Sequence, residues 1–415
     1  MNRISRADSI ETGYGWAVIV ISTLMIATAF GSSYLVTVAL KPIEAEFGVP
    51  RWLPSSAYGL ALLGAGIGGI LMGMWSDRQG MFRPALLGAV MLGTGAIVAS
   101  QAPDIYMLLA AHLLLIGLLG NASTFSPMLT NATRWFDRRR GLAVAIVGAG
   151  QSLAGAVWPP IFSWSIGTYG WRQTMLMYGI FAVAAMLPMA FVFRRPPPVP
   201  RLATSGPAER MPGDLVLGLA PNLVLAMVFF AIIGCCVAMA MPMVHIVAYC
   251  SDLGYDPARG AEMLSLLLAC AFVSRLGFGW LADRIGGLKT ILMGASAQAV
   301  MLAVYAGTDG LVALYVVSGI FGLVFGGIVP SYALVGRELF PASEAGWRIG
   351  VIFLGGTIGM GLGGVLGGAI YDITGGYSYA FLTGVGFNLL NLALIGTLVF
   401  RHSEPDMPAR APAHA

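Results

Sequence analysis

The sequence predicts an all-α membrane protein in which twelve transmembrane helices form two six-helix bundles related by pseudo-symmetry. Of its 415 residues, 57% are hydrophobic and only 10% are charged, whereas soluble domains carry about 25% charged residues. The chain also contains one loop twice, with Asp77 and Asp283 lying 206 positions apart. A second pair of loops, at residues 169–171 and 375–377, recurs at the same offset. Together these observations indicate the duplication of an apolar, membrane-spanning unit.

Runs of about 20 apolar residues, the length that crosses a bilayer as a helix, define the individual elements. The first six spans are predicted at residues 16–38, 54–75, 84–101, 105–129, 139–163 and 173–193, and the second six at residues 218–249, 260–282, 288–306, 311–335, 347–371 and 378–400. The chain is thereby divided into an N-terminal bundle (1–195), a linker (196–215), a C-terminal bundle (216–402) and a tail (403–415). The linker is polar and proline-rich, as expected of a surface connection, and the first 15 residues lack the apolar core of a signal peptide.

The positions of the cations predict the orientation, because short loops retain Lys and Arg on the cytoplasmic side. With both termini inside, 18 of the 23 Lys and Arg residues fall on the cytoplasmic side and four on the other, while Arg275 lies within a span. We therefore expect a multi-pass protein of the cell (inner or plasma) membrane with cytoplasmic termini. The same asymmetry explains the net charge of +4 without a nucleic-acid partner.

The reactive residue types do not form the patterns of an enzyme or of a metal protein. The four cysteines, Cys235, Cys236, Cys250 and Cys270, lie in or beside predicted spans and have neither zinc-site nor disulfide spacing. The sequence contains no nucleophile elbow, phosphate-binding loop or metalloprotease helix. We therefore expect no catalytic residue, no metal and no cofactor.

Each copy of the doubled loop places a cation directly after its aspartate and a glycine three positions after it. The two copies comprise Gly73, Asp77, Arg78 and Gly80, and Gly279, Asp283, Arg284 and Gly286. The glycine allows a sharp reversal of the chain, and an aspartate near a helix terminus gains about 0.3–1 kcal/mol from helix dipoles. We predict that these residues hold the cytoplasmic face closed. The alternative, an ordinary charged loop, does not explain the repetition.

The chain resembles the major facilitator superfamily and, more narrowly, its monocarboxylate transporter family. The first family signature, an acidic residue followed by Gly, small, aromatic, small and Trp, appears at residues 11–16 as Glu-Thr-Gly-Tyr-Gly-Trp. The second, an aromatic pair, a basic run and a Leu-Ala-x-Gly-x-Ala-x-Ala-Gly stretch, appears at residues 135–150. The departures from the two signatures are at Thr12, Tyr14, Trp135, Ala145 and Val147. The resemblance implies the major facilitator fold, with a substrate site at the seam between the halves.

Arg275 is the only charged residue in the middle of a predicted span. An arginine at that depth costs about 2.5–3.5 kcal/mol and persists where it faces a cavity or a partner. No carboxylate shares its helical face, whereas its guanidinium matches a ligand carboxylate in a bidentate pair. The sequence therefore predicts an organic anion as ligand, with an arginine bonded to backbone carbonyls at a helix break as the alternative. The resemblance agrees, because Arg275 occupies the place of the family's eighth-helix arginine.

The number of buried cations limits the charge of the ligand. The related oxalate and formate exchangers carry a further lysine in the eleventh helix, but residues 349–357 contain none, which favours a monocarboxylate. The family's first-helix lysine falls on Tyr34, and its aspartate four positions before the arginine falls on Ala271, so the family's proton route is not carried over. His245, beside the helix proline Pro242, is the remaining proton-coupling candidate because histidine changes charge near neutral pH. Its alternative is a structural histidine satisfied by neighbouring hydroxyls or carbonyls.

Five further residues are expected around Arg275, because polar groups at mid-depth rarely face lipid and aromatic rings form cavity walls. They are Tyr34, Asn121, Gln151, Tyr332 and Phe353.

The sequence thus predicts a carrier of small monocarboxylates, such as lactate, pyruvate or a short aliphatic or aromatic acid, that works by proton symport and functions as a monomer in the bilayer. Anion exchange is the alternative, since a lone cation disfavours the return of the empty carrier. A carrier of another organic anion stays open. A membrane sensor needs an output domain, and an intramembrane enzyme needs paired catalytic groups, neither of which is visible in the sequence.

Overall fold

The computed structural model of the protein describes residues 11–136, 139–198 and 215–403. In the N-terminal half the helices are α1 (Gly13–Val38), α2 (Leu40–Phe47), α3 (Trp52–Gln79), α4 (Phe82–Ser100), α5 (Ile105–Ala110), the π-helix η1 (Ala111–Asn121), α6 (Ala122–Trp135), α7 (Arg140–Ala190) and the short 3₁₀-helix η2 (Phe191–Arg194). In the C-terminal half they are α8 (Pro221–Asp252), α9 (Pro257–Ile285), α10 (Gly287–Ala306), α11 (Leu311–Phe325), α12 (Ile328–Leu339), α13 (Ala342–Thr374) and α14 (Ser378–Ser403). Most of the predicted linker and tail lies outside the described residues.

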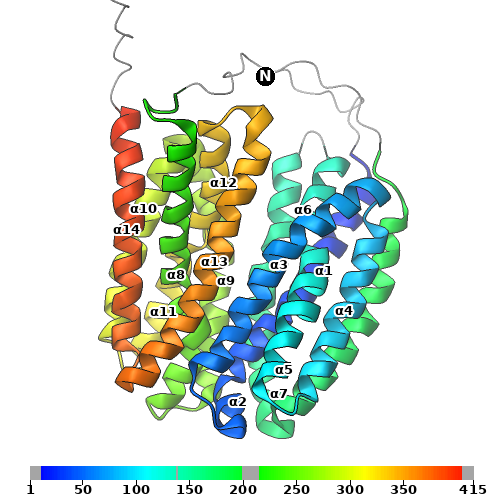
Figure 1. Ribbon diagram of the computed structural model, residues 1–415, viewed down its shortest axis with the longest axis vertical. Helices are drawn as coiled ribbons and strands as arrows, with labels where there is room; N and C mark the ends of the chain where they lie inside the picture. The colour runs from blue at the N-terminus through cyan, green and yellow to red at the C-terminus, as the bar shows by residue number, and fades with distance from the viewer. Residues whose placement is uncertain (1–10, 137–138, 199–214, 404–415) are drawn as a thin grey trace, which may run out of the picture.

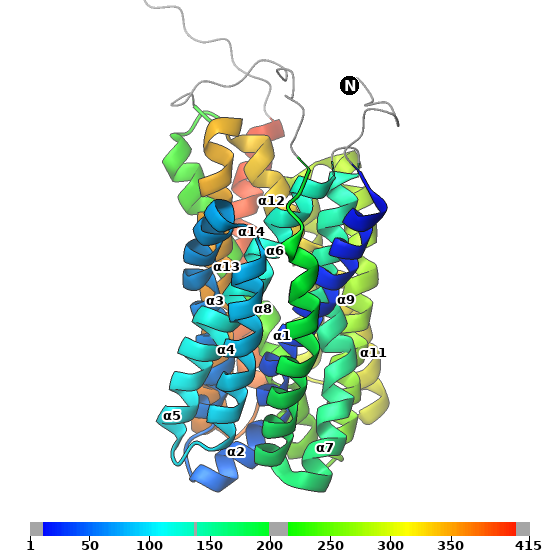
Figure 2. The same ribbon diagram turned by 90° about the vertical axis from the view of Figure 1, so that its right-hand side faces the viewer.

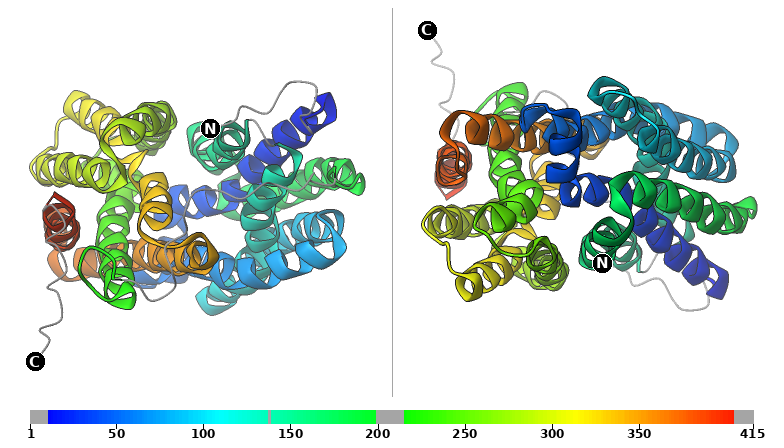
Figure 3. Two further views of the ribbon diagram at one scale, coloured as in Figure 1. Left: turned by 90° about the horizontal axis from the view of Figure 1, so that it is seen from above. Right: turned by 90° about the horizontal axis from the view of Figure 1, so that it is seen from below.

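Seen from either end, the helices form two groups, one from each half of the chain (Figure 3). The start of α1 and the end of α14 lie at the same end of the molecule (Figure 1). We call this end the termini side and the opposite end the far side. The two groups converge toward the far side (Figure 1).

The described helices make twelve membrane crossings, as the sequence predicts. Eleven helical segments are long and apolar enough to cross a bilayer. One of them contains α7, in which Gly170 adopts φ 79° and ψ 164°, a backbone conformation that favours glycine. The chain folds back on itself there, since the rings of Trp158 and Tyr178 lie 5.3 Å apart on the two sides of Gly170. The two arms of α7 are therefore two crossings.

Two local features were not predicted from the sequence. α2 is a short helix at the far side, between α1 and α3, and it supplies charged side chains to the contact between the halves. η1 is a π-helical stretch within the fourth crossing, a conformation that is rare and is often found at functional sites.

Glycines allow the two halves to approach at the seam. A side-chain Cβ at Gly59 of α3 would lie 2.7 Å from Gly361 Cα of α13, so the two backbones are in direct contact. Near the same seam α7 packs against α9 (Figure 2). Glycines on these helices thus allow close packing, both between the halves, as at Gly59, and within a half, as at Gly64 against Leu113.

Candidate functional site

Arg275 lies on α9 and reaches across the seam to the other half of the protein. Its Nη1 donates a hydrogen bond of 3.0 Å to the carbonyl oxygen of Gly148 on α7. Its Nε is enclosed and has no hydrogen-bond partner. No described carboxylate lies within ion-pair distance of the guanidinium. The carbonyl bond resembles the structural alternative for Arg275, but its acceptor belongs to the opposite half rather than to a break in α9.

Tyr34 of α1 is brought close to Arg275 of α9. A Cβ added at Gly155 of α7 would lie 2.9 Å from Cζ of the Tyr34 ring and 2.0 Å from a methyl carbon of Leu268. α1, α7 and α9 therefore meet at Gly155, two turns from Gly148 along α7. The Tyr34 hydroxyl is within electrostatic range of the Arg275 guanidinium.

Gln151 is placed on the same side of α7. It lies between Gly148 and Gly155 in the chain, and helical spacing puts positions three and four residues apart on one face. Its side chain is half-buried. It therefore lies on the face of α7 that carries the carbonyl bonded to Arg275.

Asn121 contributes an unsatisfied polar group to the N-terminal half. Its side chain is fully buried, and neither its amide oxygen nor its amide nitrogen has a hydrogen-bond partner. Phe125, one turn further along, contacts Phe30 of α1 with ring centroids 5.4 Å apart. Because the first and fourth crossings run antiparallel, this contact puts Asn121 at the level of Ser33 and Tyr34. The Oγ of Ser33 is also buried without a partner, and an unpaired buried polar group is unusual enough to need an explanation.

Tyr332 and Phe353 are not brought to Arg275. The Tyr332 hydroxyl donates a hydrogen bond of 2.7 Å to Asn391 of α14, within its own half. Asn391 in turn donates to Asn388, whose amide donates to the carbonyl of Ala295. Phe353 is 37% exposed on α13, and no ring or hydrogen-bond contact of the described residues links it to Arg275.

One residue of the seam escaped the sequence reasoning. Tyr58 of α3 is buried directly before Gly59, the residue in contact with the other half. Its hydroxyl is within electrostatic range of Tyr34 and of Cys236. The sequence feature that could have identified Tyr58 is its place directly before a glycine in an apolar span.

His245 of α8 is completely buried and bonded through both ring nitrogens. Its Nε2 lies 2.9 Å from the carbonyl oxygen of Gly364 and its Nδ1 lies 3.3 Å from the hydroxyl of Tyr377. It lies 7 residues before the end of α8, whereas Arg275 lies 18 residues after the start of α9. At 1.5 Å per residue the two side chains are separated by roughly 16 Å in depth. His245 therefore belongs to the far side and does not contact Arg275.

A cluster of charged residues joins the halves at the far side. Arg51, at the start of α3, is 3% exposed and bonds Glu44 of α2 at 2.8 Å and, across the seam, Asp252 of α8. Lys41 also bonds Asp252, at 2.9 Å. Burial opposes the charge of Arg51, but Tyr377, Asp252 and Glu44 together hold its pKa above the ordinary value. Asp372 of α13 accepts from the backbone amides of Arg51 and Trp52. We call Lys41, Glu44, Arg51, Asp252 and Asp372 the far-side cluster.

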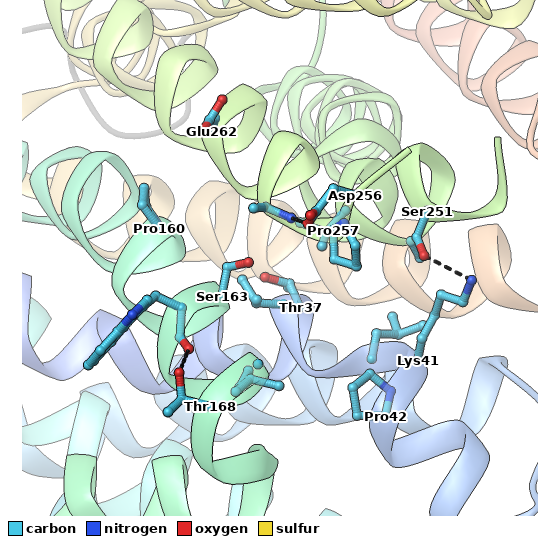
Figure 4. A pocket seen from close by; sticks show the side chains of 18 residues that line it. Thr37, Lys41, Pro42, Pro160, Ser163, Thr168, Ser251, Asp256, Pro257 and Glu262 are labelled. Atoms are coloured by element: carbon cyan, nitrogen blue, oxygen red, sulfur yellow. Dashed lines mark hydrogen bonds between the residues drawn. The ribbon is translucent and has the colours of Figure 1, made fainter. Parts of the chain in front are cut away.

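A cavity of about 720 Å³ lies at the far side rather than at Arg275. It is lined by the end of α1, the start of α2, the first arm of α7 just before Gly170, the end of α8 and the start of α9. Thr37, Ser163 and Pro257 are among the side chains that line it (Figure 4). Lys41 also lines it, and its Nζ donates a hydrogen bond of 3.0 Å to Ser251 (Figure 4). Arg275 does not line this cavity, so the two are separate features.

The doubled loops lie at the termini side and end their helices as predicted. Gly80 closes α3 with φ 79°, and Gly286 closes α9 with φ 83°. Asp77 pairs with Arg134 of α6 at 2.5 Å, and Arg284 stacks over Trp280 at 4.0 Å. A Cβ at Gly73 or Gly279 would meet nothing within 4 Å. Arg78 is exposed, and the side chain of Asp283 lies outside the described part of the chain.

Among the described residues, no group of three His, Cys, Asp or Glu side chains could hold a metal ion. Cys235, Cys236 and Cys250 are buried and Cys270 is partly buried, all with free thiols.

Comparisons with known proteins concern the family and the fold of the chain. The model of the Major Facilitator Superfamily matches residues 22–347. Monocarboxylate transporter 13 of Bos taurus is 28% identical over 365 residues, covering 85% of this chain and 82% of that protein. Monocarboxylate transporter 4 of Gallus gallus is 27% identical over 263 residues, covering 62% of this chain and 54% of that protein. The inward-facing, occupied crystal structure of a bacterial homolog of the human lysosomal transporter Spinster superposes with a TM-score of 0.74 at 14% identity, covering 94% of this chain and 98% of that one, which is a likeness of fold alone.

Proposed function

Because the chain belongs to the major facilitator superfamily and is related to monocarboxylate transporters, we propose that it carries small monocarboxylates across a membrane by alternating access. It is a multi-pass transporter and not an enzyme. The proposed substrates are lactate, pyruvate and other short aliphatic or aromatic acids.

Arg275 is the single observation that carries this proposal. Its guanidinium is at the seam, has an unpartnered Nε and lacks a described carboxylate partner. A substrate carboxylate satisfies both requirements of such a group, charge compensation and a bidentate acceptor. Tyr34, Gln151 and Asn121 are proposed to contact the rest of the substrate, together with Tyr58.

The carboxylate count follows from the charges near the seam. The face of α13 that meets the N-terminal half carries Gly361 and Thr357 and no cation, so a second substrate carboxylate finds no partner there. A dianion is therefore a poor ligand, because an unpaired carboxylate in a dry cavity costs several kcal/mol.

Transport is proposed to proceed by rocking of residues 1–195 against residues 216–402. The described form is closed at the far side by the far-side cluster and by Gly59 against Gly361. With both termini cytoplasmic, the far side is the outer side of the cell membrane. The doubled loops at the termini side, including the Asp77–Arg134 pair, are proposed to close the cytoplasmic face in the other form.

Proton symport through His245 is the proposed mode of coupling, with the carrier working as a monomer. A neutral His245 takes up one proton for each anion bound at Arg275, so the loaded carrier has the charge of the empty one. The competing mode is anion exchange. The lone charge of Arg275 favours exchange, because an empty carrier would have to return with an uncompensated cation, whereas an exchanger returns loaded.

A ligand screen on purified protein tests the substrate class. Thermal stability is measured with short mono- and dicarboxylates for the wild type, Arg275→Gln and a control, Arg259→Gln. The control removes an exposed arginine that pairs with Glu262 three residues away. Stabilisation by monocarboxylates that survives in Arg259→Gln and is lost in Arg275→Gln supports the proposal. Equal stabilisation of all three proteins overturns it.

A further inference from the structure

We propose that a hydrogen-bond chain runs from His245 through Tyr377 to Arg51. When His245 takes up a proton, this hydrogen-bond chain weakens the contacts that hold the two halves together at the far side, which is the outer side in the proposed function. The protonated carrier then stays open to the outside until an anion has bound. This inference rests on the proposed proton role of His245 and adds the device that links the proton to movement.

Arg51 is central to the contact that closes the far side. It belongs to the N-terminal half, and all of its side-chain partners except Glu44 belong to the C-terminal half. Its Nη1 donates to Asp252 and, over 3.2 Å, to the hydroxyl oxygen of Tyr377. Its guanidinium carbon lies 3.7 Å from the ring centroid of Tyr371. Charge-assisted bonds and cation–π contacts are strong in such an enclosed place.

Asp372 adds a second bond across the seam. Its two carboxylate oxygens accept from the backbone amides of Arg51 and Trp52, at 2.9 and 3.0 Å. α3 has no side-chain cap of its own, so a residue of the opposite half caps it. Opening the outer side must therefore uncap α3 as well as release Arg51.

The hydrogen bonds of His245 determine which group donates and which accepts at each step of the hydrogen-bond chain. The Gly364 carbonyl can only accept, so Nε2 carries the proton of the neutral ring and Nδ1 is an acceptor. The Tyr377 hydroxyl donates to Nδ1, which leaves its oxygen free to accept from Arg51. One hydroxyl thus connects the histidine of the C-terminal half to the arginine of the N-terminal half.

A proton on Nδ1 breaks this arrangement. Nδ1 becomes a donor, so the Tyr377 hydroxyl has to turn away, and a positive charge appears one hydroxyl away from Arg51. The charged and titratable groups that face this region are Lys41 and Glu44 of α2, Arg51 before α3, Tyr249 and Asp252 of α8, Tyr371 and Asp372 of α13, and Tyr377 before α14. The added charge weakens the hold of the C-terminal half on the Arg51 cation.

Of the three residue types in this hydrogen-bond chain, histidine is the one whose ordinary pKa lies near neutral pH. Burial raises the pKa of Tyr377, and the partners of Arg51 hold its pKa above the ordinary value despite burial. Both keep their charge state between about pH 5 and 8, the range in which histidine titrates.

Tight packing transmits the change. A Cβ at Gly367 of α13 would lie 2.5 Å from the His245 ring, and one at Gly368 would lie 2.8 Å from Trp52 Cα. α13 is therefore enclosed between the histidine on one side and the start of α3 on the other. The contacts that seal His245 from the outside are the same contacts that close the outer side.

The hydrogen-bond chain from His245 to Arg51 provides a reason for coupled transport. A protonated carrier without an anion is held open outside, so the proton does not cross alone. An anion at Arg275 bridges the halves and supplies the attraction that closes the outer side. The unprotonated empty carrier closes through Arg51 and returns.

The test measures the outer opening directly and without any substrate. Spin labels at Ala45→Cys in α2 and Ile373→Cys at the end of α13 report the distance between the halves, since both positions are exposed. The background is Cys270→Ala, because Cys270 is the one of the four free cysteines that is not buried. Pulsed dipolar spectroscopy is recorded between about pH 5 and 8.

In the parent protein we expect the longer-distance population to grow on acidification. Tyr377→Phe keeps the ring and removes the hydroxyl, so its distances should no longer respond to pH, and His245→Gln should behave in the same way. Tyr371→Phe is the matched control and should respond like the parent, because Tyr371 contacts Arg51 through its ring.

A full pH response in Tyr377→Phe, or no pH response in the parent, overturns the inference. Arg275→Gln in the same labelled background separates it from the substrate proposal. The pH response should persist in this variant even though monocarboxylate binding is lost. If the parent responds to pH but no carboxylate stabilises it, the inference about His245, Tyr377 and Arg51 stands and the substrate proposal fails.

Discussion

The guanidinium of Arg275 in the C-terminal half donates a 3.0 Å hydrogen bond to the carbonyl of Gly148 in the N-terminal half. This bond joins the two bundles that separate and rejoin in the proposed alternating-access cycle. A neutral carbonyl satisfies one N–H of the guanidinium but not its charge. A carboxylate at this place is a stronger acceptor that can engage both halves at once.

Replacing Arg275 should remove transport in a graded manner. Arg275→Gln should abolish monocarboxylate uptake into proteoliposomes, and Arg275→Lys should weaken substrate binding by about tenfold or more. Lysine keeps the charge but loses the planar fork, and a bond to a charged group is worth about 1.5–3 kcal/mol. Uptake kinetics measure both effects, with Arg259→Gln as the control. Normal uptake by Arg275→Gln would remove Arg275 from the site.

Dicarboxylates should compete poorly with monocarboxylates of equal length. The uncompensated second carboxylate has no described cation on the seam face of α13, and the cost is several kcal/mol. Inhibition of labelled lactate uptake by unlabelled propionate, pyruvate, oxalate and succinate measures the ranking. The prediction is contradicted if oxalate or succinate inhibits at lower concentration than pyruvate.

His245→Ala should separate exchange from accumulation. Exchange of labelled for unlabelled substrate requires only the loaded carrier, so it should survive, whereas accumulation driven by a proton gradient should be lost. Both assays are run on one preparation of the variant. Undiminished accumulation would make His245 structural, and a wild type that never responds to a pH gradient would favour exchange.

Gly59→Ala should weaken the form that is closed at the far side. The new methyl group would lie 2.7 Å from Gly361 Cα, and such overpacking costs about 1–3 kcal/mol. We expect slower uptake and a larger distance between labels at Ala45 and Ile373. Gly69→Ala is the matched control on the same helix, since its Cβ would lie at an ordinary 3.5 Å from Ser126. Equal behaviour of the two variants would contradict direct contact of the halves at Gly59.

Tyr332→Phe should affect stability more than transport. The change leaves Asn391 without its donor, and hydrogen bonds between membrane helices are worth about 1 kcal/mol. Thermal unfolding should therefore occur at a lower temperature while the KM for uptake stays the same. Tyr34→Phe, at the seam, should instead raise the KM. If Tyr332→Phe raises the KM and Tyr34→Phe does not, Tyr332 belongs to the substrate site after all.

Much of the architecture could be read from the chain because a bilayer imposes strict local rules. Backbone groups in lipid must be satisfied within a helix, so apolar length alone fixed the twelve crossings, and the glycines three positions after Asp77 and Asp283 fixed where α3 and α9 end. The prominence of Arg275 follows in the same way from the cost of a charge at mid-depth.

Tertiary structure decided which polar residues face which partner, because that depends on helix rotation and on contacts between distant segments. It turned Tyr332 toward Asn391, brought Tyr58 near Tyr34 and gave Arg275 a carbonyl from the opposite half. It also joined Arg51 to Asp252, 201 positions apart, and placed Tyr377 between Arg51 and His245. No local pattern encodes such pairs, since each residue alone reads as an ordinary charge or ring at a helix end.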